Sequence, residues 1–338
     1  MIATKIDVSR DHVEGTGMRA ALRERYGSVE LVQLKVIDRP AIGDAEILVR
    51  VRAAGVDRGV WHLMTGTPYP LRLAGYGFRA PKNPVLGGDF AGVVEAVGKT
   101  VTRFKPGDEV FGVAQGTFAE YARVREDKLA RKLANLTFEQ AAAVPTSGFT
   151  ALQALRDQGH VQPGQKVLVI GASGGVGTFA VQLAKAFGAE VTGVSSTTKV
   201  DLVRSIGADH AIDYTREDFA GGKPYDLILD IGGNRPVSQL RRALAPKGTL
   251  VIVGGEGGGR WFGMGRQLRA LTVSPFVRQR LTMFIASQRY QDLLVLTELI
   301  EAGKVTPAVD RVYPLSEVPQ AIRYLEDGRA RGKVVISV

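Results

Sequence analysis

Residues 166–190 read KVLVIGASGGVGTFAVQLAKAFGAE and combine an apolar run, a glycine-rich turn and a segment with helical apolar spacing. A short apolar run that ends in glycine is typical of a strand buried on both faces of a sheet. In a strand, glycine turn and helix of this order, small residues let a pyrophosphate approach the backbone, and the helix N-terminus supplies free N–H groups. The glycine spacing, G-x-x-G-x-x-G, departs from the usual G-x-G-x-x-G. The flanking strand and helix therefore carry the prediction of a dinucleotide site, against the alternative of a tight turn without a ligand.

The same alternation of strand and helix continues downstream of this turn. Apolar strands are expected at 190–196, 210–214, 225–231 and 249–255, with amphipathic segments between them. Continuous apolar strands that alternate with helices predict a doubly wound parallel sheet covered on both faces. After residue 255 we expect a loop and then a last strand within LRALTVSPFV, residues 268–277. Helices are expected at 291–303 and 316–328.

The segment upstream of the glycine turn has a different pattern. Residues 18–143 contain short strands bounded by glycine and proline, such as EILVRVRAAGV at 46–56 and PGDEVFGVA at 106–114, and they predict a β-rich domain. A helix should begin after Thr137, a suitable N-cap residue. The last strand, GKVVISV at 332–338, should return to the β-rich part. The fold class is therefore α/β, with a β-rich domain and an inserted parallel-sheet domain.

Length and composition restrict the class of protein. A chain of 338 residues fits two domains, and the absence of cysteine excludes disulfides, thiolate nucleophiles and cysteine-based zinc sites. The net charge of +10 comes from dispersed residues, so we expect a solvated basic surface and no nucleic-acid partner. No apolar run reaches the roughly 18 residues of a membrane span. Residues 1–17 lack the apolar core of a secretory signal, and we interpret them as a disordered extension of a cytoplasmic protein.

The end of the second strand of the parallel sheet indicates which dinucleotide binds. An NAD site usually has Asp or Glu there to bind the ribose 2′-OH. This strand ends in Ser195 and Ser196, followed by two threonines and Lys199, and no carboxylate occurs before Asp201. Hydroxyls and an ammonium suit a 2′-phosphate. We therefore predict NADP as the cofactor, against the alternative that Lys199 is a solvated lysine at a helix start.

Several long segments resemble the medium-chain dehydrogenase/reductase superfamily, and most closely its zinc-free quinone oxidoreductase branch. They are PVLGGDFAGVVEAVGKTVTRFKPGDEVFG, AAAVPTSGFTALQAL, the segment around the glycine turn, GADHAIDYTREDF and GKVVI. The resemblance implies a GroES-like substrate domain, residues 18–143 and 288–338, and a Rossmann NADP-binding domain, residues 144–287. It also implies a homodimer, for which the strand expected at 268–277 would offer an edge.

The resemblance assigns roles to individual residues. In quinone-oxidoreductase-like members a lysine and a tyrosine contact the 2′-phosphate, and Lys199 and Tyr214 match them; Thr150 matches a threonine near the nicotinamide. Zinc alcohol dehydrogenases carry a catalytic cysteine where Asp57 stands here, and Gly-His-Glu where this chain has 87–89, Gly-Gly-Asp. We therefore expect no metal site. The predicted cofactor-binding residues are Thr150, Gly174, Gly175, Val176, Gly177, Ser195, Ser196, Lys199, Tyr214, Gly254, Phe276 and Lys333.

The catalytic candidates are His62, Asp57 and Tyr69. Asp57 and His62 stand where zinc-free relatives have Asn and Tyr, and His62 or Tyr69 would donate to a substrate oxygen. A structural role for His62 remains the alternative. The loop GYGFRAPKNP, residues 75–84, is expected to rim the substrate cleft.

The predicted function is NADPH-dependent reduction of quinones or α,β-unsaturated carbonyls by hydride transfer without zinc. Such a substrate needs no Lewis acid, because its own carbonyl delocalises the developing enolate. One alternative is a zinc-independent alcohol dehydrogenase or ketone reductase. Another is a non-catalytic NADPH-binding sensor that kept the fold.

Overall fold

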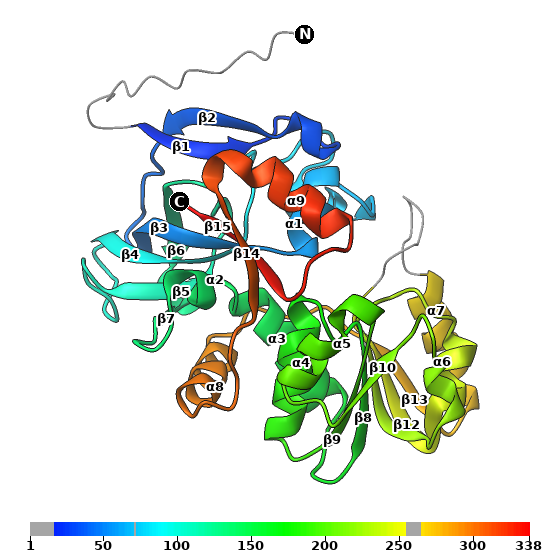
Figure 1. Cartoon of the computed structure of the whole chain (residues 1–338). Coiled ribbons are helices and arrows are strands. Elements are labelled where there is room, and N and C mark those ends of the chain that lie inside the picture. The colour runs from blue at the N-terminus through cyan, green and yellow to red at the C-terminus, as the bar shows by residue number, and fades with distance from the viewer. Residues whose placement is uncertain (1–16, 71, 255–264) are drawn as a thin grey trace.

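A seven-stranded sheet forms the core of the β-rich lobe. The computed structural model describes residues 17–70, 72–254 and 265–338, and Figure 1 shows them as two lobes. The sheet runs in the order β14-β15-β3-β4-β5-β7, with β6 also paired to β3. The hairpin of β1 (Gly17–Leu22) and β2 (Gln33–Asp38) lies beside it. The sheet strands are β3 (Glu46–Val56), β4 (Asp89–Val97), β5 (Glu109–Val113), β6 (Tyr121–Arg125), β7 (Leu129–Arg131), β14 (Val309–Pro314) and β15 (Lys333–Ser337).

The C-terminal strand returns to this lobe, as predicted. β15 pairs antiparallel with β3, with Val334 opposite Val56, and β14 lies parallel to β15 on the other side. Helix α9 (Val318–Glu326) connects β14 to β15. The chain therefore leaves the β-rich lobe, builds the second lobe and comes back, as an inserted domain requires.

The second lobe is built on a six-stranded parallel sheet. Its order is β10-β9-β8-β11-β12-β13. This is the doubly wound order, in which the first strand, β8, is central and the strand order reverses beside it. The strands are β8 (Lys166–Ile170), β9 (Glu190–Ser195), β10 (His210–Asp213), β11 (Tyr225–Asp230), β12 (Leu244–Ile252) and β13 (Arg280–Met283). Ligands of such sheets bind at the carboxyl ends of the strands, beside the reversal. Here that position lies between β8 and β11.

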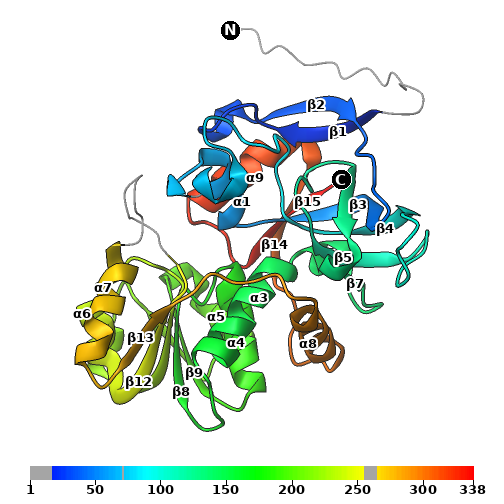
Figure 2. The ribbon, with the colours of Figure 1, turned by 180° about the vertical axis from the view of Figure 1, so that it is seen from behind.

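Both faces of β8 are buried, which explains its unbroken apolar sequence. Val167 and Val169 pack in one apolar cluster with α3 (Pro145–Gln153) and α4 (Gly175–Ala186), while Leu168 and Ile170 pack in another with α6 (Val237–Ala243) and α7 (Gly265–Val273). Figure 2 shows these helix pairs on opposite sides of the sheet. The remaining helices are α1 (Arg58–Thr65), α2 (Phe138–Ala142), α5 (Val200–Ser205) and α8 (Tyr290–Glu301). Helix α2 starts at the predicted cap, because the Thr137 hydroxyl accepts a hydrogen bond from the Gln140 N–H.

Two expectations about local structure are wrong. Residues 268–277 are not a strand, since 265–273 form α7 and a short 3-10 turn follows. The edge strand is instead β13, residues 280–283, so the edge proposed for dimerisation lies elsewhere than predicted. Leu268 and Leu271 are exposed while Ala270 is buried, which is helical and not strand-like alternation. Gly17, expected in the N-terminal extension, begins β1. The rest of that extension and most of the loop expected after residue 255 lie outside the described residues.

The length and apolar character of the helices bear on membrane insertion. Within residues 17–70, 72–254 and 265–338, none of the helices combines the length and apolar character that crossing a bilayer requires.

Candidate active site

A cleft of about 370 Å³ lies where the two lobes meet. The carboxyl ends of β8, β9 and β11 and the glycine turn form its floor on the parallel-sheet side. The start of α1 and the segment 328–333 close it on the β-rich side. It is lined by Val56, Asp57, Arg58, Ser147, Ile170, Gly171, Ser173, Gly174, Gly175, Val176, Val194, Ser195, Ser196, Lys199, Tyr214, Ile231, Gly232, Asn234, Arg235, Leu325, Gly328, Ala330, Gly332 and Lys333. The cleft thus occupies the ligand-binding position of a doubly wound sheet.

The glycine turn presents bare backbone to this cleft. Gly174 is the N-cap of α4 and has no side chain to cap the helix, so amides of the first turn remain available to a ligand. A Cβ on Gly175 would lie 3.1 Å from the Ser147 Oγ and 3.4 Å from the Lys333 Cδ. Gly177 has a different role, because its Cβ would lie 2.1 Å from the Gly171 carbonyl oxygen. The first two glycines leave space for a ligand, and Gly177 lets the helix pack against its own turn.

A buried ion cluster lies in the cleft, beside Gly175 of the glycine turn. The Lys333 ammonium, 2% exposed, donates to Asp89 Oδ2 at 3.0 Å, to Asp57 Oδ2 at 3.4 Å and to the Ser147 hydroxyl at 3.3 Å. Burial alone would lower the pKa of Lys333, but the two carboxylates outweigh burial and hold that pKa above its usual value. All three ammonium protons therefore have acceptors.

Residues outside the cluster also donate hydrogen bonds to its two carboxylates, Asp57 and Asp89. Asp89 is fully buried and accepts hydrogen bonds from the Thr146 N–H at 3.1 Å and the Thr146 hydroxyl at 2.5 Å. Asp57 is the N-cap of α1 and accepts from the Val60 N–H at 3.1 Å. Asp57, predicted as catalytic, lines the cleft but acts here as a helix cap and as the partner of Lys333. Sequence reasoning did not assign a role to Asp89 or Ser147.

The other two catalytic candidates do not line the cleft. The His62 Nδ1 lies 2.8 Å from the Thr67 carbonyl oxygen. Since a carbonyl only accepts, Nδ1 carries the proton, and Nε2 can donate only when the ring is charged. Tyr69 lies beside Arg72, whose guanidinium is 4.6 Å from the ring centroid. Both side chains therefore contact residues that are close to them in the sequence, and neither lines the cleft.

Eight of the predicted cofactor-binding residues line the cleft together: Gly174, Gly175, Val176, Ser195, Ser196, Lys199, Tyr214 and Lys333. Four do not line it: Thr150, Gly254, Phe276 and Gly177. The Thr150 hydroxyl donates to the Thr146 carbonyl one helical turn earlier, at 2.7 Å. A Cβ on Gly254 would lie 2.1 Å from the Ile231 carbonyl oxygen, and Phe276 is 88% exposed. The fourth is Gly177, which packs against the turn.

Lys199 connects the two lobes. Its ammonium donates to the carbonyl oxygens of Gly328 at 2.6 Å and Ala330 at 2.8 Å, both in the segment that closes the cleft. Burial lowers the pKa of Lys199, and the charge of Arg331 acts in the same direction. One ammonium proton remains beyond these two hydrogen bonds, so the side chain can hold the segment and still offer a donor.

A further cation at this end of the cleft was missed from the sequence. Arg235 lines the cleft, and its guanidinium lies 5.3 Å from the ring centroid of Tyr214. It belongs to the segment IGGNRP, residues 231–236, which directly follows β11. Polar residues just after the carboxyl end of a strand next to the reversal point face the ligand site of such a sheet. That position was the signal that could have identified Arg235.

Comparisons with known proteins agree with this architecture. Residues 43–134 match the family model of the alcohol dehydrogenase GroES-like domain, and residues 206–336 match that of the zinc-binding dehydrogenases. The chain is 34% identical to the mouse mitochondrial NAD(P)H oxidoreductase RTN4IP1, over 98% of this chain and 92% of that protein. It is also 34% identical to the chloroplastic NADPH-dependent alkenal/one oxidoreductase of Arabidopsis thaliana, over 98% and 82%. The structure of the quinone oxidoreductase from Coxiella burnetii superposes with a TM-score of 0.84 at 29% identity, covering 95% of this chain and 99% of that one.

The chain therefore belongs to the medium-chain dehydrogenase/reductase superfamily and is quinone oxidoreductase-like. Its GroES-like domain and Rossmann-type parallel sheet are those expected from the sequence. The division at residues 143/144 and 287/288 stays a prediction.

The name of the second family model implies zinc, and the residues of this cleft do not fit that metal. Zinc needs three or four N, O or S ligands in a tetrahedral arrangement. Asp57 and Asp89 occupy two of the positions in question, but the Lys333 ammonium binds both carboxylates. Over the described ranges 17–70, 72–254 and 265–338, no group of three His, Asp or Glu side chains could hold a metal ion. The Lys333 ammonium therefore already binds the two carboxylates that a zinc ion would need as ligands.

Proposed function

We propose that the protein is an NADPH-dependent reductase of quinones or α,β-unsaturated carbonyls that works without zinc. The observation that carries the proposal is one cleft in which an uncapped glycine turn faces an ion cluster centred on Lys333. Relatives named as NAD(P)H and NADPH-dependent alkenal/one oxidoreductases support this class of reaction. We also propose a cytoplasmic location, on the grounds given for the sequence, and a homodimer, for which the family resemblance is the ground because residues 268–277 are not an edge strand.

The residues of the cleft fit a nicotinamide dinucleotide. The backbone of Gly174, Gly175 and Val176 would hold the pyrophosphate at the N-terminus of α4. The hydroxyls of Ser195 and Ser196, with Lys199 beyond them, would bind the 2′-phosphate. When bound, the reduced cofactor supplies a hydride. The protein's part is to bind and orient the two reactants against each other.

The ion cluster limits what the protein contributes to proton transfer. The Lys333 ammonium lies between two carboxyl groups, and burial raises the pKa of one of them, Asp89. Because each ammonium proton is bound to an acceptor, we assign Lys333 a positioning role and not that of a proton donor. The Ser147 hydroxyl, which accepts from Lys333, has its own proton to donate to a substrate oxygen in the cleft. This assignment replaces His62 and Tyr69 as the first candidate donor.

A cofactor-oxidation assay on a panel of quinones, enones, ketones and aldehydes tests the proposal. We expect NADPH consumption with quinones and enones, and rates at least about tenfold lower with simple ketones, because an isolated carbonyl needs the Lewis acid that this site lacks. Faster reduction of ketones would favour a zinc-independent ketone reductase. Tight NADPH binding by calorimetry with no turnover across the panel would favour a nucleotide-binding sensor.

Zinc content provides a separate prediction. Purified protein should carry no stoichiometric zinc, and a chelator should leave the reductase activity intact, because Lys333 competes for the carboxylates that a metal would need. Elemental analysis after purification, with the activity measured before and after chelation, gives the result. About one zinc per chain, as a catalytic metal site contains, together with loss of activity on chelation would show that the metal-free assignment is wrong.

A further inference from the structure

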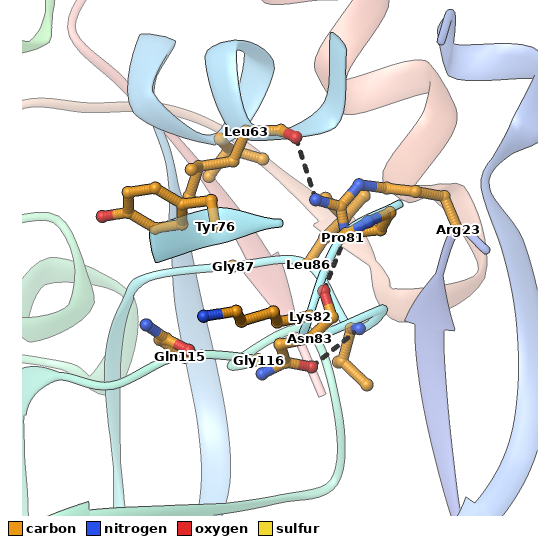
Figure 3. Close-up of a pocket in the computed structure, with 12 residues that line it drawn as sticks. Arg23, Leu63, Tyr76, Pro81, Lys82, Asn83, Leu86, Gly87, Gln115 and Gly116 are labelled. Carbon is orange, nitrogen blue, oxygen red and sulfur yellow. Dashed lines mark hydrogen bonds between the residues drawn. The ribbon is translucent and has the colours of Figure 1, made fainter. Parts of the chain in front are cut away.

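A second, smaller cavity lies in the β-rich lobe, beside α1. Its volume is about 100 Å³, whereas a water molecule needs only about 10–15 Å³ of such space. Figure 3 shows it between α1, carrying Leu63, and the loop that leads into β4. It is lined by Arg23, Val60, Leu63, Tyr76, Pro81, Lys82, Asn83, Val85, Leu86, Gly87, Gln115 and Gly116. The cavity is large enough for a group of several non-hydrogen atoms.

The cavity contains a buried arginine whose charge has no carboxylate partner in the part of the chain that the structure describes. Arg23 is only 4% exposed. Its Nη atoms donate to the carbonyl oxygens of Leu63, Asn83 and Pro84 at 2.9–3.0 Å, as the dashed lines in Figure 3 partly show. Its Nε–H has no acceptor among the described residues. A guanidinium has five N–H donors, so three hydrogen bonds leave two donors without an acceptor among the described residues.

Burying a cation without a counter-ion is unfavourable. In agreement with that cost, burial lowers the pKa of Arg23. An anion bound beside the guanidinium would recover part of this free energy. The buried Arg23 guanidinium is therefore less favourable without a bound anion than with one, and its charge is complementary to a negative group.

The rest of the lining indicates the chemistry of that group. Lys82 adds a second positive charge, and none of the described residues that line the cavity is Asp or Glu. In Figure 3 the side chains of Lys82, Gln115 and Tyr76 extend toward the same side of the cavity. Val60, Leu63 and Leu86 supply an apolar wall. A planar carboxylate on a small apolar body matches these features, because a guanidinium binds carboxylates through two parallel hydrogen bonds.

The cavity shares its walls with the large cleft. Asp57 and Arg58, at the start of α1, line the cleft, while Val60 and Leu63 of the same helix line the cavity. A helix rises 1.5 Å per residue, so Leu63 lies roughly 9 Å along the axis from Asp57. Gly87, another lining residue, is two positions before Asp89 of the ion cluster. Helix α1 therefore forms part of the wall of both spaces.

We propose that Arg23 and Lys82 bind a carboxylate at the far end of the substrate, and that the enzyme prefers enones or quinones which carry such an acidic group. This inference rests on the proposed reductase function. It names a substrate class that the glycine turn and the ion cluster do not specify.

The test compares an enone that carries a terminal carboxylate with its own methyl ester. With the native protein and NADPH, we expect kcat/KM to be at least about tenfold higher for the acid, which corresponds to one charge-assisted contact. Lys82→Ala should reduce this preference several-fold, mainly by lowering kcat/KM for the acid. Lys99→Ala, which removes an exposed lysine of another loop, is the matched control and should keep the full preference.

Arg23 needs a more careful variant because its three carbonyl contacts also hold the chain. Arg23→Lys keeps the charge but loses the bidentate geometry, and it should abolish most of the preference if its melting temperature stays close to that of the native protein. If Arg23→Lys does not fold, Lys82→Ala still decides. Equal constants for acid and ester in the native protein would overturn the inference and leave the reductase function standing. If neither compound is reduced, the reductase function fails, and calorimetric binding of the acid against the ester decides the inference by itself.

Discussion

Replacing Lys333 by methionine should lower the free energy of unfolding by about 3–5 kcal/mol and abolish most of the reductase activity. Methionine keeps the apolar length of the side chain but leaves Asp89, fully buried, and Asp57 beside each other without a cation. Removing one partner of a buried ion pair carries a cost of this size because an uncompensated charge stays in the interior. Chemical denaturation of Lys333→Met and native protein at pH 7 measures the difference.

A second substitution separates the ion pair from the packing. Asp89→Asn combined with Lys333→Met removes the Lys333 and Asp89 ionisable groups and leaves Asp57, so the double variant should be more stable than Lys333→Met alone. Lys199→Met, which removes a half-buried lysine that donates to two backbone carbonyls, is the control and should cost much less. A loss below about 1 kcal/mol in Lys333→Met, the range of exposed ion pairs, would contradict the role given to the cluster.

The pH dependence gives an independent readout of the same pair. The pKa of Lys333 is raised in the folded protein, so its contribution is fully present below the unfolded pKa of about 10.4 and is lost as the pH rises through the higher folded value. Native protein should therefore lose stability above about pH 10.4 by an increment that Lys333→Met lacks.

Local sequence patterns predicted the framework of the molecule well. The glycine turn, the apolar strands around it and the returning C-terminal strand are encoded by neighbouring residues, through strand burial and helix periodicity. The serines after β9 were found because the end of that strand has a known place in a doubly wound sheet. The prediction failed at 268–277, where three β-branched residues and one aromatic residue favour a strand. Packing of Ala270 against the sheet instead selects a helix.

Side-chain partners far apart in sequence could not be predicted. Lys333 and Asp57 are 276 residues apart, and only the pairing of β15 with β3 brings them together. Asp57 is polar and lies in the right segment, so it was interpreted as catalytic, although it caps α1 and binds Lys333. Arg23 gave no signal at all, because one arginine in a strand-like segment is ordinary unless its burial is known. The fold could be predicted from local sequence patterns, whereas the partners of the charged side chains are determined by tertiary contacts.

The choice between NADPH and NADH should depend on Arg235 and Lys199, and the two residues should differ in how they affect it. Arg235 lines the cleft, and its guanidinium lies 5.3 Å from the ring centroid of Tyr214. Arg235→Ala should therefore raise the KM for NADPH and leave that for NADH nearly unchanged. A charge-assisted contact of about 1.5–3 kcal/mol corresponds to roughly a ten- to hundredfold change in affinity.

Lys199→Ala should act on both cofactors, because Lys199 also holds the segment of Gly328 and Ala330 that closes the cleft. We expect a roughly ten- to hundredfold loss of kcat/KM with NADPH and a smaller loss with NADH, which has no phosphate but still needs a closed cleft. Lys223→Ala, an exposed lysine outside the cleft, is the control and should change neither. The ratio of the two kcat/KM values is the decisive quantity, since general damage to the site lowers both by the same factor. A native protein that prefers NADH, or an unchanged ratio in both variants, would mean that these cations serve only to hold the lobes together and that no 2′-phosphate binds beside them.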